Sequence, residues 1–283
     1  MADRKRQTTI RTVRELLFTQ PLARLYSSPC VGRAGQTSDT QEPFAEVIAE
    51  ELLRIQVAQL LGSVGIPPQR AMPYRQGHDG TVSTPTTPRS ATSERRLAIA
   101  LYNYSRDHGG DCFGLLGQPI DYEVPLQAQR GAGIGEIDLL TQVKEESPGI
   151  ENARGVYVVE LKRKREKSPE SLLRSVLQIA TYYQQLDREK LLRDYGLYGD
   201  PSGYGTHEIR KAVLVFRGSA QEREIQAIKK GSLPNLRRLI EDLGVHLFVI
   251  DADDTVVDQG TGPYRPVLQG GGAGVRSVKR VLL

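Results

Sequence analysis

Apolar residues recur at three- and four-residue spacing in the N-terminal quarter of the chain. In the segment FAEVIAEELLRIQVAQLL this spacing places several apolar side chains on one helical face: Phe44, Ile48, Leu52, Ile55 and Leu60. We predict helices over residues 8–26 and 43–62, joined by the loop SSPCVGRAGQTSDTQ. From Gly62 to Ser93 the chain is rich in Gly, Pro, Ser and Thr, which predicts a linker or a long surface loop.

A regular succession of helix and strand patterns follows. SERRLAIALYNYSRDH predicts an amphipathic helix with Thr92 or Ser93 as its N-cap. Three strand patterns come next, IDYEVPLQ, EIDLLTQV and VYVVELK, separated by the Gly-rich QRGAGIG and the polar KEESPGIENARG. Ser168 is the predicted cap of a long helix with Pro169 in its first position, where proline is best tolerated. After a second linker come the strand RKAVLVFR, the helix AQEREIQAIKK, the segment LPNLRRLIEDLG and the strand VHLFVID.

This order of elements predicts the fold class. Short connections favour antiparallel pairing of the first three strands, and helical crossovers favour parallel pairing of the later ones. We therefore expect an α/β fold, with a mixed central β-sheet flanked by helices. The expected organisation is a helical N-terminal extension (1–75), a linker (76–92), a core (93–258) and a Gly-rich C-terminal tail (259–283) that drapes over the surface or frays.

Composition narrows the class of protein. Of the 283 residues, 39% are hydrophobic and 25% charged, as in ordinary soluble globular proteins. No apolar run approaches the roughly 20 residues of a membrane span, and the basic N-terminus lacks the apolar segment of a signal peptide. Two cysteines make no disulfide framework, which favours the cytoplasm, and four scattered histidines argue against a zinc site. A net charge of +4 leans toward polyanionic partners.

Charged residues interrupt two of the apolar strand patterns. Glu160 and Lys162 share one face of a predicted strand, because side chains two residues apart point the same way. Asp138 lies in the preceding strand, and its neighbours Ile137 and Leu139 should face the opposite side. If these two strands pair, Asp138 can stand beside Glu160, and two carboxylates and an ammonium group converge on one spot.

Such a cluster has a recognisable chemistry. Two close carboxylates repel each other, and a divalent cation relieves the repulsion. Oxygen ligands with open positions suit Mg²⁺, which binds through one or two carboxylates and keeps waters and phosphate oxygens; we expect Mn²⁺ to substitute. Lys162 would hold a water or help to deprotonate it, and the metal would stabilise negative charge on a phosphate. These groups together can hydrolyse a phosphodiester.

The same residues carry a family resemblance. Asp138, about twenty residues before Glu160-Leu161-Lys162, resembles the motif of the PD-(D/E)XK nuclease superfamily, although Ile137 stands where that motif often has proline. The resemblance implies a restriction-endonuclease-like fold. It also implies that Asp138 and Glu160 bind metal, that the Leu161 carbonyl adds a ligand, and that Lys162 is the catalytic lysine.

The predicted helix after these strands adds a second motif. Gln178 and Tyr182 form a QxxxY pattern, which resembles the RecB-type branch of the superfamily. Arg174, Gln178 and Tyr182 lie four residues apart and form one helical stripe. The resemblance spans roughly residues 93–251 and implies one further catalytic residue, a glutamate on the helix before the first core strand. Glu94 is best placed for that role.

Each of these residues also has a structural interpretation. An E-x-K pattern can be a cross-strand ion pair, with Lys162 at an exposed strand end. Gln178 and Tyr182 could be ordinary helix-surface residues, and Glu94 could simply complement a helix N-terminus. Two further acids, Glu136 and Glu123, could compete as metal ligands.

A basic run follows the third strand. Arg163, Lys164 and Arg165 could be solvated, but beside a phosphodiester-cleaving site we expect them, with Arg174, to contact DNA phosphates. The glycines of GAGIG indicate a hairpin loop, because no Lys-Ser/Thr follows them. No Walker motif is present, so ATPase activity is not expected.

These patterns lead to one expected function and two alternatives. The first is a Mg²⁺-dependent, RecB-like deoxyribonuclease acting on DNA ends or structured DNA. A sequence-specific restriction endonuclease would use the first 75 residues for recognition or for forming a homodimer. The third is a catalytically silent DNA-binding or assembly module of the same fold.

Overall fold

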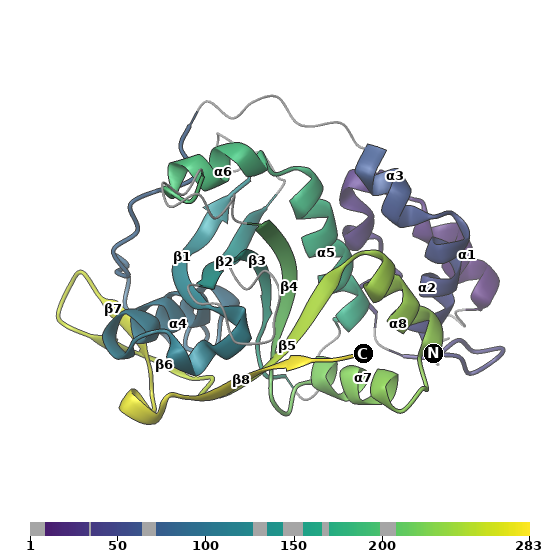
Figure 1. The fold of residues 1–283 in the computed structure, drawn as a ribbon. Helices are drawn as coiled ribbons and strands as arrows, with labels where there is room; N and C mark the ends of the chain where they lie inside the picture. Colours follow the sequence, from purple (N-terminus) through teal and green to yellow (C-terminus); the bar gives the residue numbers. More distant parts are fainter. Residues whose placement is uncertain are drawn as a thin grey trace.

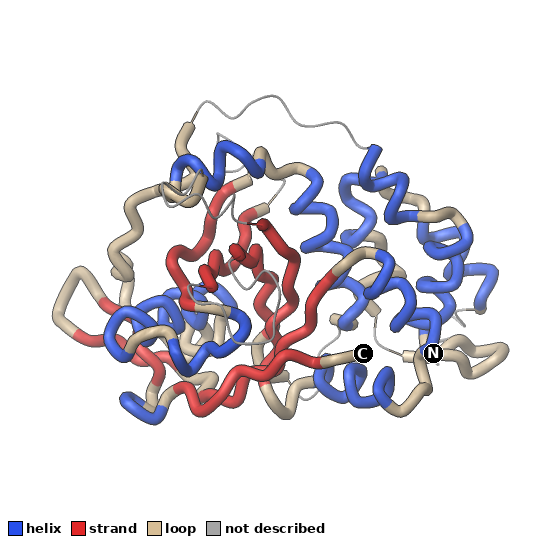
Figure 2. Tube along the Cα trace, in the orientation of Figure 1, coloured by secondary structure: helices blue, strands red, loops and turns tan. Residues whose placement is uncertain are grey.

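A computed structural model describes residues 9–33, 35–63, 72–126, 135–143, 155–165, 170–198 and 208–283. Its centre is a six-stranded mixed sheet in the order β1-β2-β3-β4-β5-β8, with helices on both faces (Figures 1 and 2). The strands are β1 Gln118–Pro125, β2 Glu136–Val143, β3 Gly155–Lys162, β4 Glu208–Phe216, β5 Val245–Ala252 and β8 Val275–Val281. A separate two-stranded sheet contains β6 Val256–Gln259 and β7 Arg265–Leu268.

Strand directions agree with the predicted α/β class. β1, β2 and β3 pair antiparallel in sequence, whereas β3, β4 and β5 pair parallel. The parallel crossovers are helical, since α5 and α6 connect β3 to β4, and α7 and α8 connect β4 to β5. The helices of this part are α4 Glu94–His108, α5 Leu172–Gln184, α6 Arg188–Asp194, α7 Ala220–Lys229 and α8 Pro234–Asp242.

Two apolar clusters cover the two faces of the sheet. On one face α4 and the short helix η2 (Asp111–Leu116) pack against a cluster that includes Leu139, Val159 and Leu161. On the other face α5, α7 and α8 pack against a cluster that includes Val158 and Val213. Because residues two apart share a face, Glu160 and Lys162 belong to the α5 face with Val158.

The N-terminal extension packs on the outer side of α5 (Figure 1). It contains α1 Ile10–Leu17, η1 Leu22–Ser27, α2 Phe44–Arg54 and α3 Val57–Ser63, so each of the two predicted helices is broken. The first break lies at Pro21, which cannot continue a helix, and the second at Gln56, whose φ is +54°. The buried residues of these helices belong to the same apolar cluster as α5. α5 is buried over most of its surface because it lies between the sheet and these helices.

The described part of the predicted linker is fixed to the core. Tyr74 is buried; its backbone N–H donates to Asp194 Oδ2 at 2.7 Å, and its hydroxyl accepts from the Asp187 N–H at 2.9 Å. Further along, Val82 forms a β-bridge with Tyr264. The composition of this segment is that of a linker or a long surface loop, but its described residues make hydrogen bonds with the core.

The prediction that the chain after about Asp258 drapes over the surface or frays is wrong for its last strand. β8 pairs antiparallel with β5, with Val249 opposite Lys279 and Ile250 opposite Val278. The glycine-rich stretch before it forms only a short turn that contains η3 (Gly271–Ala273). β8 thus completes the sheet from outside the range predicted for the core.

Two further predictions concern local features. Ser93 is the N-cap of α4, as expected, and its hydroxyl accepts from the Arg96 N–H at 3.2 Å. α5 begins later than predicted, because Ser171 is its N-cap, while Ser168 and Pro169 lie outside the described residues. Among the described helices, none has both the length and the apolar character needed to cross a bilayer.

Candidate active site at the ends of β2 and β3

The register of β2 and β3 brings the two predicted carboxylates together. Leu140 lies opposite Val158, and Leu139 opposite Val159. One more step of this register places Asp138 opposite Glu160, on the α5 face of the sheet. Beyond the last backbone pair, Asp138 Oδ2 accepts the N–H of Leu161 at 2.7 Å, which fixes its carboxylate at the end of β3.

The neighbours of Asp138 agree only in part with strict alternation. Leu139 packs in the α4-side cluster, opposite to Asp138, as predicted. Ile137 packs in the α5-side cluster with Leu126, so the expectation that it faces away from that side is wrong. The β2 pattern therefore loses its regular alternation at the end of the strand that carries the site.

Lys162 is buried at the end of β3 and has three carboxylate partners. Only 5% of the residue is exposed. Its Nζ lies 2.9 Å from Glu160 Oε1, 3.2 Å from Glu94 Oε2 and 3.5 Å from Glu170 Oε2. Lys162 does pair with Glu160, as the structural interpretation expects, but that interpretation is wrong about exposure, because the pair is buried.

The electrostatics of the cluster are dominated by burial and by excess negative charge. Burial by itself lowers the pKa of Lys162, but the charges of Glu160, Glu94, Asp138 and Glu170 together raise it well above the usual lysine value. Burial, followed by the charge of Glu160, raises the pKa of Asp138 well above its ordinary range. Burial also raises the pKa of Glu160, and Lys162 offsets only part of that rise. The site thus holds more anions than its one ammonium can balance.

One oxygen in this cluster lacks any hydrogen bond. Glu160 is 1% exposed, and among the described residues its buried Oε2 finds no partner, although Oε1 is paired with Lys162. A buried carboxylate oxygen without a partner is costly, and a bound cation would satisfy it. These carboxylates therefore fit a divalent ion.

The number of protein ligands available to a metal is small. Within the described ranges, no set of three or more Asp, Glu, His or Cys side chains is arranged to hold a metal ion. A cation here would rest on Asp138 and Glu160, together with water and the predicted Leu161 carbonyl. That sparse set suits Mg²⁺, which binds through one or two carboxylates and keeps several waters.

The QxxxY residues lie beside the carboxylates and contact each other. Gln178 Nε2 donates to the Tyr182 hydroxyl at 3.2 Å. The Tyr182 ring meets Tyr26 edge-on at 5.6 Å. Burial and then the charge of Glu160 raise the pKa of Tyr182, so its phenol stays protonated.

The Tyr182 hydroxyl also lies close to Gly135, just before β2. A Cβ atom at Gly135 would lie 2.1 Å from the Tyr182 hydroxyl oxygen, and the φ of Gly135 is +103°. Both the close approach and the backbone angle require glycine there. The motif therefore braces the strand that carries Asp138, three residues after Gly135.

Two acids complete the surroundings of Lys162. Glu94, in the first turn of α4, accepts a hydrogen bond from Lys162 Nζ at 3.2 Å, and its catalytic role stays a prediction. Glu170 was not predicted; it precedes the N-cap of α5, touches Lys162, and its Oε1 pairs with Arg174 Nη1 at 3.1 Å. The only sequence signal for it was the i,i+4 spacing from Arg174.

The two alternative acidic ligands, Glu136 and Glu123, make contacts outside the Lys162 cluster. Glu136 is half-buried at the start of β2, where its backbone pairs with Pro125. The carboxylate of Glu123 pairs with Arg95 Nε at 2.9 Å. Of the GAGIG glycines, Gly131 and Gly133 lie outside the described residues.

The side chains of the basic run after β3 contact two different parts of the protein. Arg163 Nη1 donates to both the backbone oxygen and the hydroxyl of Thr92 at 2.6 Å. Exposed Lys164 lies over Gly218 instead, 3.1 Å from where a Cβ would be. A pocket of about 490 Å³ adjoins the site, and its lining comprises Thr87, Arg89, Ser90, Ser93, Glu94, Arg163, Arg165 and Glu170.

Comparison of the chain with models of protein families, with curated proteins and with solved structures finds no match. Family and activity are therefore proposals that depend on the geometry described above.

Proposed function

We propose that the protein is a metal-dependent nuclease with a restriction-endonuclease-like core of the PD-(D/E)XK type, and that it hydrolyses DNA phosphodiester bonds with Mg²⁺. The observation that carries the proposal is the buried cluster of Asp138, Glu160 and Lys162, in which one Glu160 oxygen has no partner among the described residues. Most buried carboxylate oxygens in structural ion pairs have a hydrogen-bond partner, so this oxygen favours a bound cation.

Each residue has a role that follows from its contacts. Asp138 and Glu160 would hold Mg²⁺, which when bound supplies stabilisation of negative charge on the phosphate. The Lys162 ammonium, held by three carboxylates, is placed to donate a hydrogen bond to an attacking water or to a phosphate oxygen. Tyr182 and Gln178 keep β2 in position and exclude water from the α5 side.

The adjoining pocket supports a polyanionic substrate. Three arginines, Arg89, Arg163 and Arg165, line the pocket. Arg163 also donates to Thr92, and the two acids of the lining, Glu94 and Glu170, are engaged with Lys162. The other lining side chains are hydroxyls. Guanidinium and hydroxyl groups are the usual contacts of a nucleic-acid backbone.

The test is a cleavage assay with the purified protein. Linear duplex, circular duplex and single-stranded DNA are incubated with Mg²⁺, with Mn²⁺ or with EDTA, and we expect cleavage with either metal and none in EDTA. Asp138→Asn should abolish cleavage, and Lys162→Met should lower it by on the order of 10². The matched control is Glu241→Gln, which removes an exposed carboxylate on α8 and should cut at the wild-type rate.

Two results would contradict the proposal. Wild-type cleavage by Asp138→Asn and Lys162→Met would mean that the activity belongs to another site. A wild-type protein that binds DNA but cuts none of the substrates with either metal would favour the catalytically silent module. Glu136→Gln tests the competing acid, and we expect it to retain cleavage because Glu136, unlike Glu94 and Glu170, makes no ion pair with Lys162 among the described residues.

A further inference from the structure

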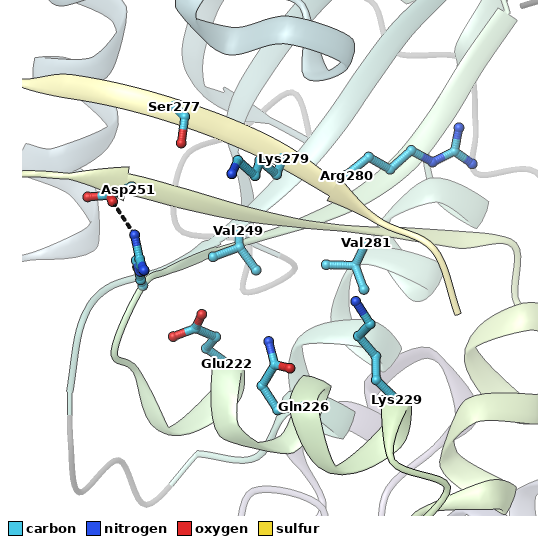
Figure 3. A pocket seen from close by; sticks show the side chains of 10 residues that line it. Glu222, Gln226, Lys229, Val249, Asp251, Ser277, Lys279, Arg280 and Val281 are labelled. Carbon is cyan, nitrogen blue, oxygen red and sulfur yellow. Dashed lines mark hydrogen bonds and ion pairs between the residues drawn. The ribbon is translucent and has the colours of Figure 1, made fainter.

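A second pocket lies between α7 and the strands β5 and β8, at the edge of the sheet (Figure 3). Its volume is about 280 Å³. Gln226 and Lys229 point into it from α7, while Val249 of β5 and Val281 of β8 form an apolar wall opposite them (Figure 3). Lys279 borders the pocket from β8. The pocket thus combines an apolar wall with ammonium and amide donors.

The positive charges of this pocket are available to a ligand. Lys229 and Lys279 are exposed, and neither has an ion-pair or hydrogen-bond partner in the part of the chain that the structure describes. The guanidinium of Arg280 is directed away and meets His246 Nε2 at 3.1 Å. Two ammonium groups that are unpaired among the described residues therefore line the pocket.

The negative charges of the pocket are already engaged. Glu222 Oε2 accepts the Gly218 N–H at 2.5 Å. The carboxylate of Asp251 accepts from Arg217 and from Arg276, each at 2.7 Å. The pocket consequently presents net positive charge to solvent, which favours an anionic ligand.

The pocket and the candidate active site lie on one face of the sheet and at one level. Lys162 is opposite Val215, Val215 is opposite Val249, and Val249 is opposite Lys279. Three strand spacings of about 4.8 Å separate Lys162 from Lys279, or about 14 Å straight across the sheet. At about 3.4 Å per nucleotide along a duplex strand, that interval corresponds to about four nucleotides.

Cations also occupy the interval between the two sites. Lys164 lies over Gly218, and Arg217, which follows β4 and is paired with Asp251, lines the edge of the pocket with an exposed side chain. Both lie at the strand ends beside the N-terminus of α7, whose first residue, Ala220, donates its N–H to the Arg165 oxygen. A chain of phosphates leaving the active site would therefore pass cations before it reached the pocket.

We propose that this pocket is a second phosphate-binding site, in which Lys229, Lys279 and Gln226 hold a backbone phosphate of the same nucleic acid about four nucleotides from the bond that is cut. The proposal rests on the nuclease function proposed above and extends it, because it assigns a minimum length to the substrate. Short nucleic acids reach only the active site, whereas longer ones reach both.

The test compares a double variant, Lys229→Ala with Lys279→Ala, with a control of equal charge change, Lys230→Ala with Arg238→Ala. The control residues are exposed and lie outside the pocket. Binding is measured by fluorescence anisotropy in EDTA, so that no strand is cut. The ligands are a duplex of about 24 base pairs and a single-stranded trinucleotide, whose two phosphates span fewer than the roughly four nucleotides between the site and the pocket.

We expect the pocket variant to bind the long duplex about fivefold more weakly than wild type at 0.15 M salt, with a slope of log K against log salt shallower by about one, as for loss of one phosphate contact. The trinucleotide should bind all three proteins equally, and its cleavage with Mg²⁺ should be unchanged. Unaltered binding of the long duplex, or an equal loss in the control, would overturn the second site while leaving the nuclease function standing. A wild-type protein that neither binds nor cuts either ligand would overturn both proposals.

Discussion

Replacement of Lys162 by methionine tests the buried cluster most directly. Methionine preserves most of the volume of the side chain and removes its charge. Glu160, which is 1% exposed, would then keep a buried negative charge with neither oxygen paired to Lys162. Glu94 and Glu170 retain contact with solvent, so the main cost falls on Glu160.

The expected loss follows from the burial of the pair. Removing one partner of a buried ion pair costs about 3–5 kcal/mol of unfolding free energy, whereas an exposed pair is worth about 0–1 kcal/mol. Glu160→Gln removes the buried charge that Lys162→Met leaves behind. The double variant should therefore be more stable than Lys162→Met alone, with a coupling energy of about 2–3 kcal/mol in the metal-free protein.

The assay is urea unfolding in EDTA for wild type, both single variants and the double variant. Far-UV circular dichroism is the suitable signal, because the chain has no tryptophan. Lys229→Met is the matched control, since Lys229 is exposed, and it should change stability by less than about 0.5 kcal/mol. A loss below about 1 kcal/mol for Lys162→Met, or a double variant no more stable than that single one, would refute the reasoning.

Three further predictions concern charge. Asp138→Ala should abolish cleavage and leave the metal-free fold at least as stable as wild type, because it relieves the repulsion between Asp138 and Glu160. Cleavage assays and urea unfolding check this. A variant that is destabilised but still active would mean that Asp138 has a structural role. Neutralising Arg163, Lys164 and Arg165 together should weaken DNA binding and reduce its salt dependence in anisotropy titrations. An unchanged slope of log K against log salt would mean that these side chains are solvated and do not contact DNA. Burial, and then the charge of Arg280, lower the pKa of His246 to about 4 in the folded protein. The unfolded chain therefore takes up a proton at higher pH than the folded one does. The contribution of neutral His246 to the unfolding free energy is complete above about pH 6.5 and is lost as the pH falls toward 4. His246→Gln should remove that dependence, on the order of 3 kcal/mol, in urea titrations across this range, and an unchanged pH profile would contradict it.

The sequence predicted the centre of the sheet because alternation and strand order are local signals. The β2 pattern alternates in part, and the apolar β3 pattern carries Glu160 and Lys162 two residues apart, so they share a face. An antiparallel connection leaves few ways to pair these two strands. The placement of Asp138 and Glu160 on one face of the sheet therefore followed from the residues alone. The presence of α5 and the capping role of Ser93 followed from periodicity and cap preference in the same way, whereas the first residue of α5 did not.

Other features depend on contacts between residues far apart in the chain. β8 carries a weak strand pattern after a glycine-rich stretch, and its pairing with β5 comes from tertiary structure. The burial of Lys162 requires Glu94 and Glu170 to converge from two helices, which no local pattern encodes. Ile137 deviates from alternation because the core extends around the end of its strand. The unsatisfied oxygen of Glu160 is likewise visible only when all neighbours are in place.

The packing of the N-terminal helices on α5 also bears on how this chain can vary in evolution. Ser171, the cap of α5, donates its hydroxyl to the Val31 oxygen, and Tyr26 meets Tyr182 beside the carboxylates. Exchanging residues 9–63 for an unrelated module would expose the outer face of α5 and loosen the tyrosine that braces β2. A new N-terminal segment would therefore have to arise by gradual substitution, with compensating changes along α5, and recombination at the segment boundary would be selected against.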